Sequence, residues 1–597
     1  MRRFPLSIAA PTGVLLLAVL ALLGGCVGAR SPSPDTPIDI SLIAFNDLHG
    51  NLQPPGIAIP APAAGGGTVA IPAGGAAYVA SAIAFLKAGN PNHAVVSAGD
   101  MIGASPLVSA LFLDEPTIEA VNAMKIDFNA VGNHEFDKGR AELVRMQEGG
   151  CTQHTPLQPC RLNPAFPGAN FGFLAANTVR ADGSTLFPAT GIKRFTQNGR
   201  TVTVGFIGMT LRNTPTIVSP AGVRGLRFTD EAQTANALVA PLKAQGADAI
   251  VLLIHEGGTT KVGFNDHRCT GLAGDILPIL DKLSPEIEVV VSGHTHQSYV
   301  CELPTADPAR RRLLTSAGLY GTLLTHIRLA IDPATHRVVA KTADNVIVQG
   351  KPFTRGSTVI ALSDQYRAFP PDPAVAALIA RYAAAAEPLA RRVVGPLGVA
   401  LTRQLSPSRE NALGNLIADV QLAATRAPDK GGAQLAFMNP GGVRNDLTPN
   451  ADGSVSYGQL FSTQPFGNSL VVKTMTGGQI RRVLEQQFAS GTNTATSPKV
   501  LLPSDGFSYA YDLSQPAGAR ISRMRLNGID MVDTERYRVS MNSFLAAGGD
   551  NFTVFNEGTD ALGGEQDIDA MESYIRANGP LRAPATDRIA NLTPRTR

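Results

Sequence analysis

The 597-residue sequence has no run of five or more basic residues, and its formal net charge at pH 7 is only +3. Proteins held to nucleic acid by electrostatics carry a strong basic excess, so this balance argues against a nucleic-acid partner. Two catalytic motifs are also absent: the GxSxG turn of many serine hydrolases and the GxxxxGK[ST] loop that cradles phosphates. A serine hydrolase and a P-loop enzyme are therefore poor interpretations.

Long hydrophobic runs are lacking too. Beyond the N-terminal region no segment has 18 consecutive apolar residues, so the sequence predicts no membrane-spanning helix in the mature chain. Hydrophobic residues make up 44% of the chain and charged residues 17%, a composition that excludes a disordered chain. At roughly 100–200 residues per domain, the length predicts two or three domains, and the many glycines and prolines are typical of loop-rich α/β proteins.

The first 26 residues are predicted to be an export signal. Two arginines give it a positive start, and its apolar stretch at 13–23 is too short to span a bilayer. Its end, Leu23-Gly24-Gly25-Cys26, resembles a bacterial lipoprotein signal, which implies that Cys26 becomes the lipidated first residue. Ordinary signal-peptidase cleavage is the alternative. Residues 27–37 are then a tether, and the chain is expected in the periplasm or cell envelope, held to a membrane by lipid alone.

Four further cysteines, Cys151, Cys160, Cys269 and Cys301, form an even set in a chain expected to be exported. That set predicts two disulfides. Three connectivities are open, and we prefer the pairing of sequence neighbours. A zinc–thiolate site is the alternative, although no CxxC spacing supports it.

One pattern repeats through residues 38–330: a short apolar, β-like run ends and polar residues follow it. Five of the ten histidines lie directly after such runs. Sites in open α/β sheets form beyond the carboxyl ends of the strands, so these side chains are predicted to share one crevice. The runs are 38–45, 94–97, 128–131, 249–254 and 289–292, and the polar residues after them include Asp47, His49, Asp100, Asn133, His134, Asp137, His255, His294 and His296.

Seven of these residues are candidate metal ligands. One divalent ion rarely takes seven mixed nitrogen and oxygen ligands from a protein, so the set predicts two divalent ions, with Zn, Mn, Co, Ca and Mg all open. A pair of divalent ions suits a displacement at phosphorus. The candidate ligands are Asp47, His49, Asp100, Asn133, His255, His294 and His296.

The periodicity changes after about residue 350. The alanine-rich segment 372–394 predicts one exposed helix that joins two domains, within a linker at 351–394. Residues 395–590 are predicted to form the second domain. In the first domain, 74–86 is predicted to be a helix packed on the sheet. The segment 53–73, rich in proline, glycine and alanine, is interpreted as a flexible rim of the site or as a disordered surface insertion.

In the second half, aromatic residues lie on glycine-rich turns, notably Phe466 and Phe544. Rings on such turns are less typical of a core than rings in strands, and two of them can sandwich a flat base. Packing in the core remains the alternative for each ring. Arg409 and Arg444 offer forked donors that suit phosphate or ribose oxygens.

Together these motifs resemble the bacterial and animal 5′-nucleotidase family of the metallophosphoesterase superfamily, which includes periplasmic UDP-sugar hydrolases. The resemblance implies an α/β fold. Its N-terminal part (38–350) would be a four-layer α/β sandwich, joined by the linker helix to a C-terminal α/β substrate-binding domain (395–590). The first-half motifs are Asp47-x-His49, Gly99-Asp100, Gly132-Asn133-His134-Glu135 and Gly293-His294-x-His296.

The resemblance also implies roles for individual residues. Asp100 would bridge the two ions, His134 would be a catalytic histidine that binds no metal, and Asp137 would orient it. The two metal sites would be completed by Asp47, His49 and His296 and by Asn133, His255 and His294. In the second domain the implied contacts are Phe466 and Phe544 on the nucleobase, Asn439 on the base, Arg409 and Arg444 on phosphate or ribose, and Asp550 on the ribose hydroxyls.

The sequence thus predicts an exported hydrolase that removes phosphate from nucleoside 5′-monophosphates, with 2′,3′-cyclic nucleotides and UDP-sugars as further candidate substrates. Two alternatives stay open. One is a relative of the thiosulfohydrolases with a substrate other than a nucleotide, and the other is a non-catalytic lipoprotein that binds nucleotides. The sequence makes no prediction of oligomeric state.

Overall fold

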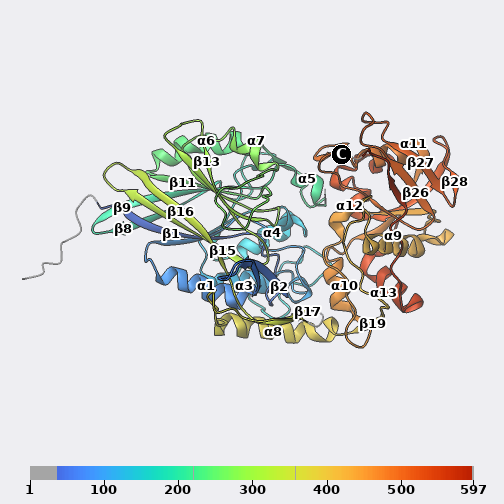
Figure 1. Cartoon of the computed structure of the whole chain (residues 1–597), viewed down its shortest axis with the longest axis horizontal. Coiled ribbons are helices and arrows are strands. Elements are labelled where there is room, and N and C mark those ends of the chain that lie inside the picture. The colour runs from blue at the N-terminus through green and yellow to red at the C-terminus, as the bar shows by residue number, and fades with distance from the viewer. Residues whose placement is uncertain (1–35, 220, 356–357, 595–597) are drawn as a thin grey trace, which may run out of the picture. The chain divides into compact units, whose positions relative to one another are not determined.

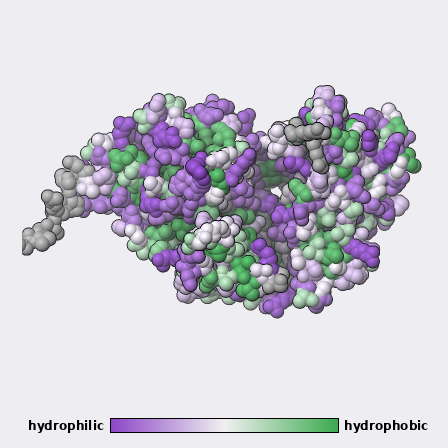
Figure 2. All heavy atoms as spheres, in the orientation of Figure 1, coloured by the Kyte–Doolittle hydropathy of each residue, from purple (hydrophilic) through white to green (hydrophobic). Residues whose placement is uncertain are grey.

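A computed structural model describes residues 36–219, 221–355 and 358–594 (Figure 1). The predicted signal, Cys26 and all of the tether before Thr36 lie outside the described residues. In the described part of the chain, no helix has the length and apolar character needed to cross a membrane. On the face drawn in Figure 2, hydrophobic residues lie in small patches among polar ones.

Two six-stranded mixed sheets form the first half of the described chain. Their central strands are parallel neighbours, so several strand ends meet at one edge of each sheet. One sheet has the order β16 (Arg337–Ile347), β15 (Leu323–Asp332), β1 (Ile38–Phe45), β4 (His93–Ser97), β5 (Phe128–Ala130) and β6 (Gly172–Leu174). The other has the order β13 (Ser298–Pro304), β14 (Arg311–Ala317), β12 (Ile287–Ser292), β11 (Ala249–Ile254), β9 (Arg200–Met209) and β8 (Thr190–Gln197).

Strand β1 shows why these strands read as continuous apolar runs. Leu42 and Ala44 face the other sheet, whereas Ile43 and Phe45 pack beneath helices on the opposite face. A strand buried on both faces loses the polar alternation of a half-exposed strand. The hydrophobic effect therefore fixes β1 in the centre of the sandwich.

The two sheets pack face to face through one hydrophobic cluster, and helices cover both outer faces. This arrangement confirms the predicted four-layer α/β sandwich. The covering helices are α1 (Ala76–Ala88), α3 (Glu115–Met124) and α4 (Arg140–Glu148) on the first sheet and α6 (Glu231–Ala244) and α7 (Ile276–Leu280) on the second.

The interpretation of 53–73 as a flexible rim or a disordered insertion was wrong. The segment forms an ordered antiparallel hairpin of β2 (Ile57–Pro62) and β3 (Thr68–Ala73). Ile71 is fully buried and packs in a small cluster with Leu323. Its proline content obscured the strands, because proline is normally confined to edge strands such as these.

Helix α8 (Pro373–Ala390) confirms the predicted linker helix. The Asp372 side chain caps it by accepting hydrogen bonds from two backbone N–H groups of its first turn. It is amphipathic rather than wholly exposed, because one face is buried against α1 and α3 (Figure 1). On that face the Tyr382 hydroxyl donates to Glu119 at 2.8 Å.

The second half contains a five-stranded and a four-stranded sheet with their own hydrophobic clusters, which gives the chain a two-domain α/β architecture. The boundaries proposed at 38–350, 351–394 and 395–590 stay predictions. The five-stranded sheet has the order β25 (Leu502–Pro503), β20 (Leu435–Met438), β29 (Arg536–Asn542), β22 (Ser469–Thr476) and β30 (Thr559–Gln566). The four-stranded sheet has the order β28 (Ile529–Asp530), β27 (Ile521–Leu526), β26 (Phe507–Tyr511) and β31 (Ile589–Asn591), and the main helices are α9 (Ala412–Thr425), α11 (Gly477–Glu485) and α13 (Asp567–Asn578).

Both disulfides join neighbours in the sequence, which confirms the preferred pairing. Cys151 bonds Cys160, and Cys269 bonds Cys301. The second bond ties the loop after β11 to strand β13.

Candidate active site

The polar residues singled out from the sequence lie where five strands of the two sheets end. Each of these strands is parallel to a neighbour, so the loops that leave them converge. Asp47 and His49 follow β1, Asp100 follows β4, Asn133, His134 and Asp137 follow β5, His255 follows β11, and His294 and His296 follow β12.

Asp100 lies at the centre of this cluster. Its Oδ2 atom is 2.9 Å from Nε2 of His255 and 3.6 Å from Nε2 of His49. Asp47 lies beside it, with Oδ1 at 3.4 Å from Nε2 of His296. Three sets of donor atoms are close enough to hold a metal ion: Asp47, His49 and His296; His49, Asp100 and His134; and Asp100, His255 and His294.

Backbone carbonyls orient two of these imidazoles. Nδ1 of His49 lies 2.9 Å from the Gly103 carbonyl, and Nδ1 of His255 lies 2.7 Å from the Ala98 carbonyl. Because a carbonyl only accepts, each Nδ1 carries a hydrogen, and each Nε2 faces the carboxylates. This is the arrangement in which proteins present histidine to a metal.

Two buried polar atoms support the same conclusion. Nε2 of His255 and Oδ1 of Asn133 have no hydrogen-bond partner within the described ranges. Nε2 of His255 nonetheless lies against a carboxylate oxygen of Asp100, and two acceptors in such contact repel one another unless a proton or a cation lies between them. The residues therefore fit a divalent cation.

The protonation of the histidines agrees in part with this role. Burial, aided by neighbouring positive groups, lowers the pKa of His49 well below its usual value and that of His294 to about 3, so both are neutral. Burial also opposes the charged form of His255, but the Asp100 carboxylate outweighs it and raises the pKa of His255 to about 10. A cation bound there would displace that proton.

The backbone at the cluster is strained and closely packed. Five of the seven candidate ligands have left-handed φ values, which non-glycine residues rarely adopt and which cost about 1–3 kcal/mol each. Glycine is required beside them: a Cβ on Gly132 would lie 2.3 Å from Oδ1 of Asp100, and one on Gly99 would lie 2.6 Å from Nδ1 of His255. The strained ligands are Asp47, His49, Asp100, His294 and His296.

His134 and Asp137 form the predicted pair. The short 3₁₀ turn after Asn133 places Asp137 one turn from His134, with its carboxylate oxygens 2.9 Å and 3.0 Å from Nδ1. The backbone N–H of Ala104 also donates to Asp137 at 2.9 Å and fixes the carboxylate. Burial lowers the pKa of His134, but the carboxylates of Asp137 and Asp100 outweigh it and leave that pKa above its ordinary value.

Glu135 has a structural task that its motif did not reveal. Its carboxylate accepts hydrogen bonds from the backbone N–H groups of Asp100, Met101 and Gly132. These bonds tie the loop after β4 to the loop after β5. Glu135 therefore holds the loops that carry these candidate metal ligands together, and desolvation by burial raises its pKa to about 7.

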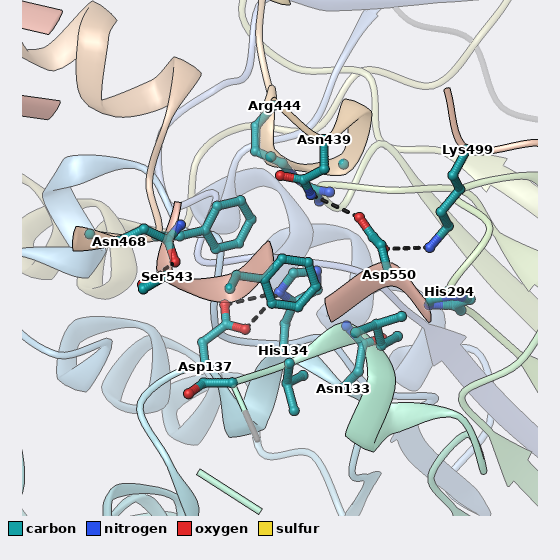
Figure 3. Close-up of a pocket in the computed structure, with 18 residues that line it drawn as sticks. Asn133, His134, Asp137, His294, Asn439, Arg444, Asn468, Lys499, Ser543 and Asp550 are labelled. Atoms are coloured by element: carbon teal, nitrogen blue, oxygen red, sulfur yellow. Dashed lines mark hydrogen bonds and ion pairs between the residues drawn. The ribbon is translucent and has the colours of Figure 1, made fainter. Parts of the chain in front are cut away.

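A pocket of about 360 Å³ opens beside His134 and Asp137 (Figure 3). It joins residues of the first half to residues of the second, and five of the six substrate-side predictions line it. Those from the first half include Asn133, His134, Asp137 and His294, and those from the second half include Asn439, Arg444, Phe466, Phe544 and Asp550.

The two predicted aromatic residues line the pocket rather than the core. The Phe466 ring stacks on the His134 imidazole, with centroids 5.8 Å apart and planes 19° apart, and the Arg444 guanidinium lies 5.8 Å from the Phe466 centroid. The Phe544 ring lies close against the glycine turn, since a Cβ added at Gly549 would lie only 2.5 Å from ring atoms. The turn glycine thus lets the ring lie directly on the backbone.

Arg409 is the exception among the predicted residues. It is exposed, has a left-handed φ of 68°, and is absent from the described lining of the pocket. Its contact with phosphate or ribose stays a prediction. Asn468, Lys499 and Ser543 also line the pocket but were not predicted as site residues. Asn468 and Ser543 lie on the same turns as Phe466 and Phe544, whereas Lys499 belongs to no pattern that could have revealed it.

Family comparisons match both halves of the chain. The calcineurin-like phosphoesterase model matches residues 40–298, and the model of the 5′-nucleotidase C-terminal domain matches residues 392–557. The chain belongs to the 5′-nucleotidase family of the metallophosphoesterase superfamily. Membership of this family supports a hydrolase that acts on nucleotides, and the family implies divalent metal ions.

Individual proteins agree with this assignment. The crystal structure of a 5′-nucleotidase precursor from Thermus thermophilus matches with a TM-score of 0.72 and 25% identity, covering 93% of this chain and 99% of that one. Endonuclease YhcR of Bacillus subtilis is 30% identical over 92% of this chain, which spans only 40% of that protein's length. Sulfate thiohydrolase SoxB of Thermus thermophilus has a TM-score of 0.65 at 17% identity, over 94% of this chain and 97% of its own, and shares the fold.

Proposed function

We propose that this 5′-nucleotidase family member is an exported two-metal hydrolase that releases phosphate from nucleoside 5′-monophosphates. The observation that carries the proposal is one pocket in which a histidine–carboxylate cluster adjoins aromatic walls. A nucleotide has the matching parts, since its phosphate suits cations and its base suits aromatic rings.

Two divalent ions, when bound, would neutralise phosphate oxygens and activate a water molecule for attack at phosphorus. Asp100 suits the bridging position because its carboxylate reaches His49 and His255, which belong to different donor sets. Asp47, His49 and His296 would complete one site. Asn133, His255 and His294 would complete the other.

The chain's own acid is His134. The carboxylates of Asp137 and Asp100 raise the pKa of His134 above its ordinary value despite burial, which favours the protonated ring. Asp137 engages Nδ1, so Nε2 is the nitrogen available to the pocket. From there it would hydrogen-bond a phosphate oxygen and protonate the leaving 5′-oxygen. Asp137 keeps the ring oriented and balances its charge.

The second-half residues would hold the nucleoside. Phe466 and Phe544 would stack on the base, and Asn439 lies close enough in the lining to contact it. Arg444 would pair with phosphate or ribose oxygens. Asp550, whose buried carboxylate also lines the pocket, would accept hydrogen bonds from the ribose hydroxyls.

Export and anchoring through Cys26 rest on the N-terminal sequence pattern. Two disulfides and the similarity to a 5′-nucleotidase precursor from Thermus thermophilus support an exported chain. YhcR is named an endonuclease, but this chain spans less than half of that protein, so we propose no nuclease activity.

Two alternative functions can be distinguished from a nucleotidase by experiment. A SoxB-like substrate would make no use of Phe466 and Phe544, and a non-catalytic binder would need neither His134 nor Asp137. The deciding experiment measures phosphate release from a panel of nucleoside monophosphates, a 2′,3′-cyclic nucleotide and a UDP-sugar. It is run after chelation and again with Mn, Zn, Co, Ca or Mg restored. We expect monophosphates to be hydrolysed only with a cation present, and no release under any condition would refute the proposal.

A further inference from the structure

Lys499 is a positively charged residue of the pocket that the sequence did not predict. The Lys499 ammonium lies 2.6 Å from Oδ1 of Asp550, and its side chain is 33% exposed (Figure 3). The backbone N–H of Lys499 donates to the Gln487 carbonyl, which fixes the segment that carries it. Of the described residues, only Asp550 hydrogen-bonds the ammonium, so two of its three N–H groups remain free for a ligand.

Asp550 is held from its other side as well. Its Oδ2 accepts a hydrogen bond from Nδ2 of Asn439 at 2.8 Å, and Oδ1 of Asn439 accepts one from Asn542 at 2.9 Å. Asn542 in turn caps the short helix that carries Phe544. These hydrogen bonds hold the buried Asp550 carboxylate in place before a ligand binds. The Asp550 backbone is in the left-handed region, with φ at 55°.

The chemistry of this pair favours a neutral ligand with hydroxyl groups. An ionised carboxylate has about four lone-pair positions, so Asp550 can still accept hydrogen bonds after Lys499 and Asn439 have taken two. A hydroxyl both donates and accepts. One hydroxyl of a vicinal diol can donate to Asp550 while the oxygen of the other accepts from Lys499. A phosphate group at this position would lie against the Asp550 carboxylate and be repelled.

We infer that Lys499 is a specificity-determining residue that, together with Asp550, recognises the 2′,3′-diol of ribose. This inference rests on the proposed function and adds the class of nucleotide preferred. Ribonucleotides with a free diol are favoured. Deoxyribonucleotides lose one or both hydrogen bonds, and nucleotides phosphorylated at the 2′ or 3′ position are repelled.

The test compares kcat/KM for AMP, 2′-deoxy-AMP and 2′,3′-dideoxy-AMP in the metal-loaded protein. Hydrogen bonds to charged groups correspond to about a tenfold to hundredfold effect, so wild type should prefer AMP over dideoxy-AMP by about that factor. Lys499→Met should lower kcat/KM for AMP about tenfold and change the dideoxy substrate less than twofold. Lys430→Met, which removes an exposed lysine paired with Glu565 away from the pocket, is the matched control and should leave the preference unchanged.

The outcomes separate this inference from the proposed function. Equal kcat/KM for AMP and dideoxy-AMP in wild type overturns the inference while the nucleotidase activity stands, and it needs no variant. Parallel losses on both substrates in Lys499→Met also overturn it, because a purely structural role would act on both alike. If wild type releases no phosphate, the proposed function fails. Calorimetry with adenosine and 2′,3′-dideoxyadenosine then decides the inference, which requires about tenfold tighter binding of adenosine.

Discussion

Nδ1 of His134 lies between the two carboxylate oxygens of Asp137, at 2.9 Å and 3.0 Å. The pair is partly exposed at the pocket, and its orientation is fixed by the Ala104 N–H that donates to Asp137. The histidine ring is thereby set with one nitrogen bound to the carboxylate and the other available to a substrate.

Removing the imidazole should separate catalysis from binding. We expect His134→Ala to lower kcat by about 10²- to 10⁴-fold, because the leaving oxygen loses its proton donor. Nucleotide binding, measured by calorimetry, should persist. The exposed His154→Ala is the control and should match wild type. Unchanged kcat in His134→Ala would show that this histidine is not the acid.

The aromatic walls should matter only for substrates that carry a base. Stacking on a base contributes about 1–3 kcal/mol, so Phe466→Ala and Phe544→Ala should each lower kcat/KM for AMP by about 5- to 150-fold. Ribose 5-phosphate, which has no base, serves as the control substrate and should be affected far less. Equal losses on both substrates would contradict the clamp, and unchanged AMP turnover would favour the SoxB-like alternative.

The Cys269–Cys301 disulfide connects two segments that carry candidate metal ligands. Cys269 lies in the loop after His255, and Cys301 lies in the strand after His296. We expect Cys269→Ser with Cys301→Ser to lower the Tm and to weaken metal binding, measured by competition with a chelator. Closing the 32-residue separation restricts the unfolded chain by about 4 kcal/mol.

The Cys151–Cys160 pair provides the matched control. Its separation is 9 residues, for which about 3 kcal/mol is expected, and neither cysteine belongs to a candidate metal-binding group in the described chain. Its double serine variant should therefore lose stability but keep wild-type metal affinity. Equal metal affinities in the two double variants would show that the Cys269–Cys301 bond has no special relation to the site.

Asp567 should make stability depend on pH. Burial raises its pKa to about 7 despite opposing hydrogen bonds from the Ile568 backbone and the Asn468 side chain, and its Oδ1 has no hydrogen-bond partner in the described structure. The folded state therefore binds this proton more tightly than the unfolded state, whose pKa is near 3.9. Stability falls as pH rises from about 4 to 7, and above pH 7 the full cost remains.

Asp567→Asn should consequently raise the Tm at pH 8 and have little effect near pH 4. Three pKa units correspond to at most about 4 kcal/mol. Asp569→Asn is the control, since Asp569 lies in the same first turn of α13 but is exposed. An equal effect of Asp567→Asn at both pH values would show that burial of the charge is not the cause. Because Asn468 lines the pocket, kcat/KM should be followed as well.

The sequence predicted those residues whose role is visible in a local pattern, such as an apolar strand followed by a polar loop. Leu42 and Phe45 belong to a strand buried on both faces, and Asp47 and His49 follow directly in a loop. Side chains with no such pattern were missed. Lys499 acts through a carboxylate 51 residues away in the chain, and this pairing exists only in the folded domain.

Three further features that the sequence did not predict correctly also have physical explanations. The 53–73 hairpin is stabilised by tertiary packing of residues such as Ile71, which overrides the local signal of proline and glycine. Glu135 uses its carboxylate on backbone N–H groups, and a motif of residue types does not distinguish such a role from catalysis. The exposed position of Arg409 depends on the strained loop before α9.

We propose that seven side chains hold a pair of divalent cations with Asp100 between them. Metal content per chain, measured by mass spectrometry after loading and desalting, tests it most directly. Wild type and Asp39→Ala, which removes an exposed aspartate of β1, should retain two ions. Asp100→Ala should lose both, because its carboxylate reaches His49 and His255 alike. Wild type that retains no ion, or Asp100→Ala that retains two, would contradict the account.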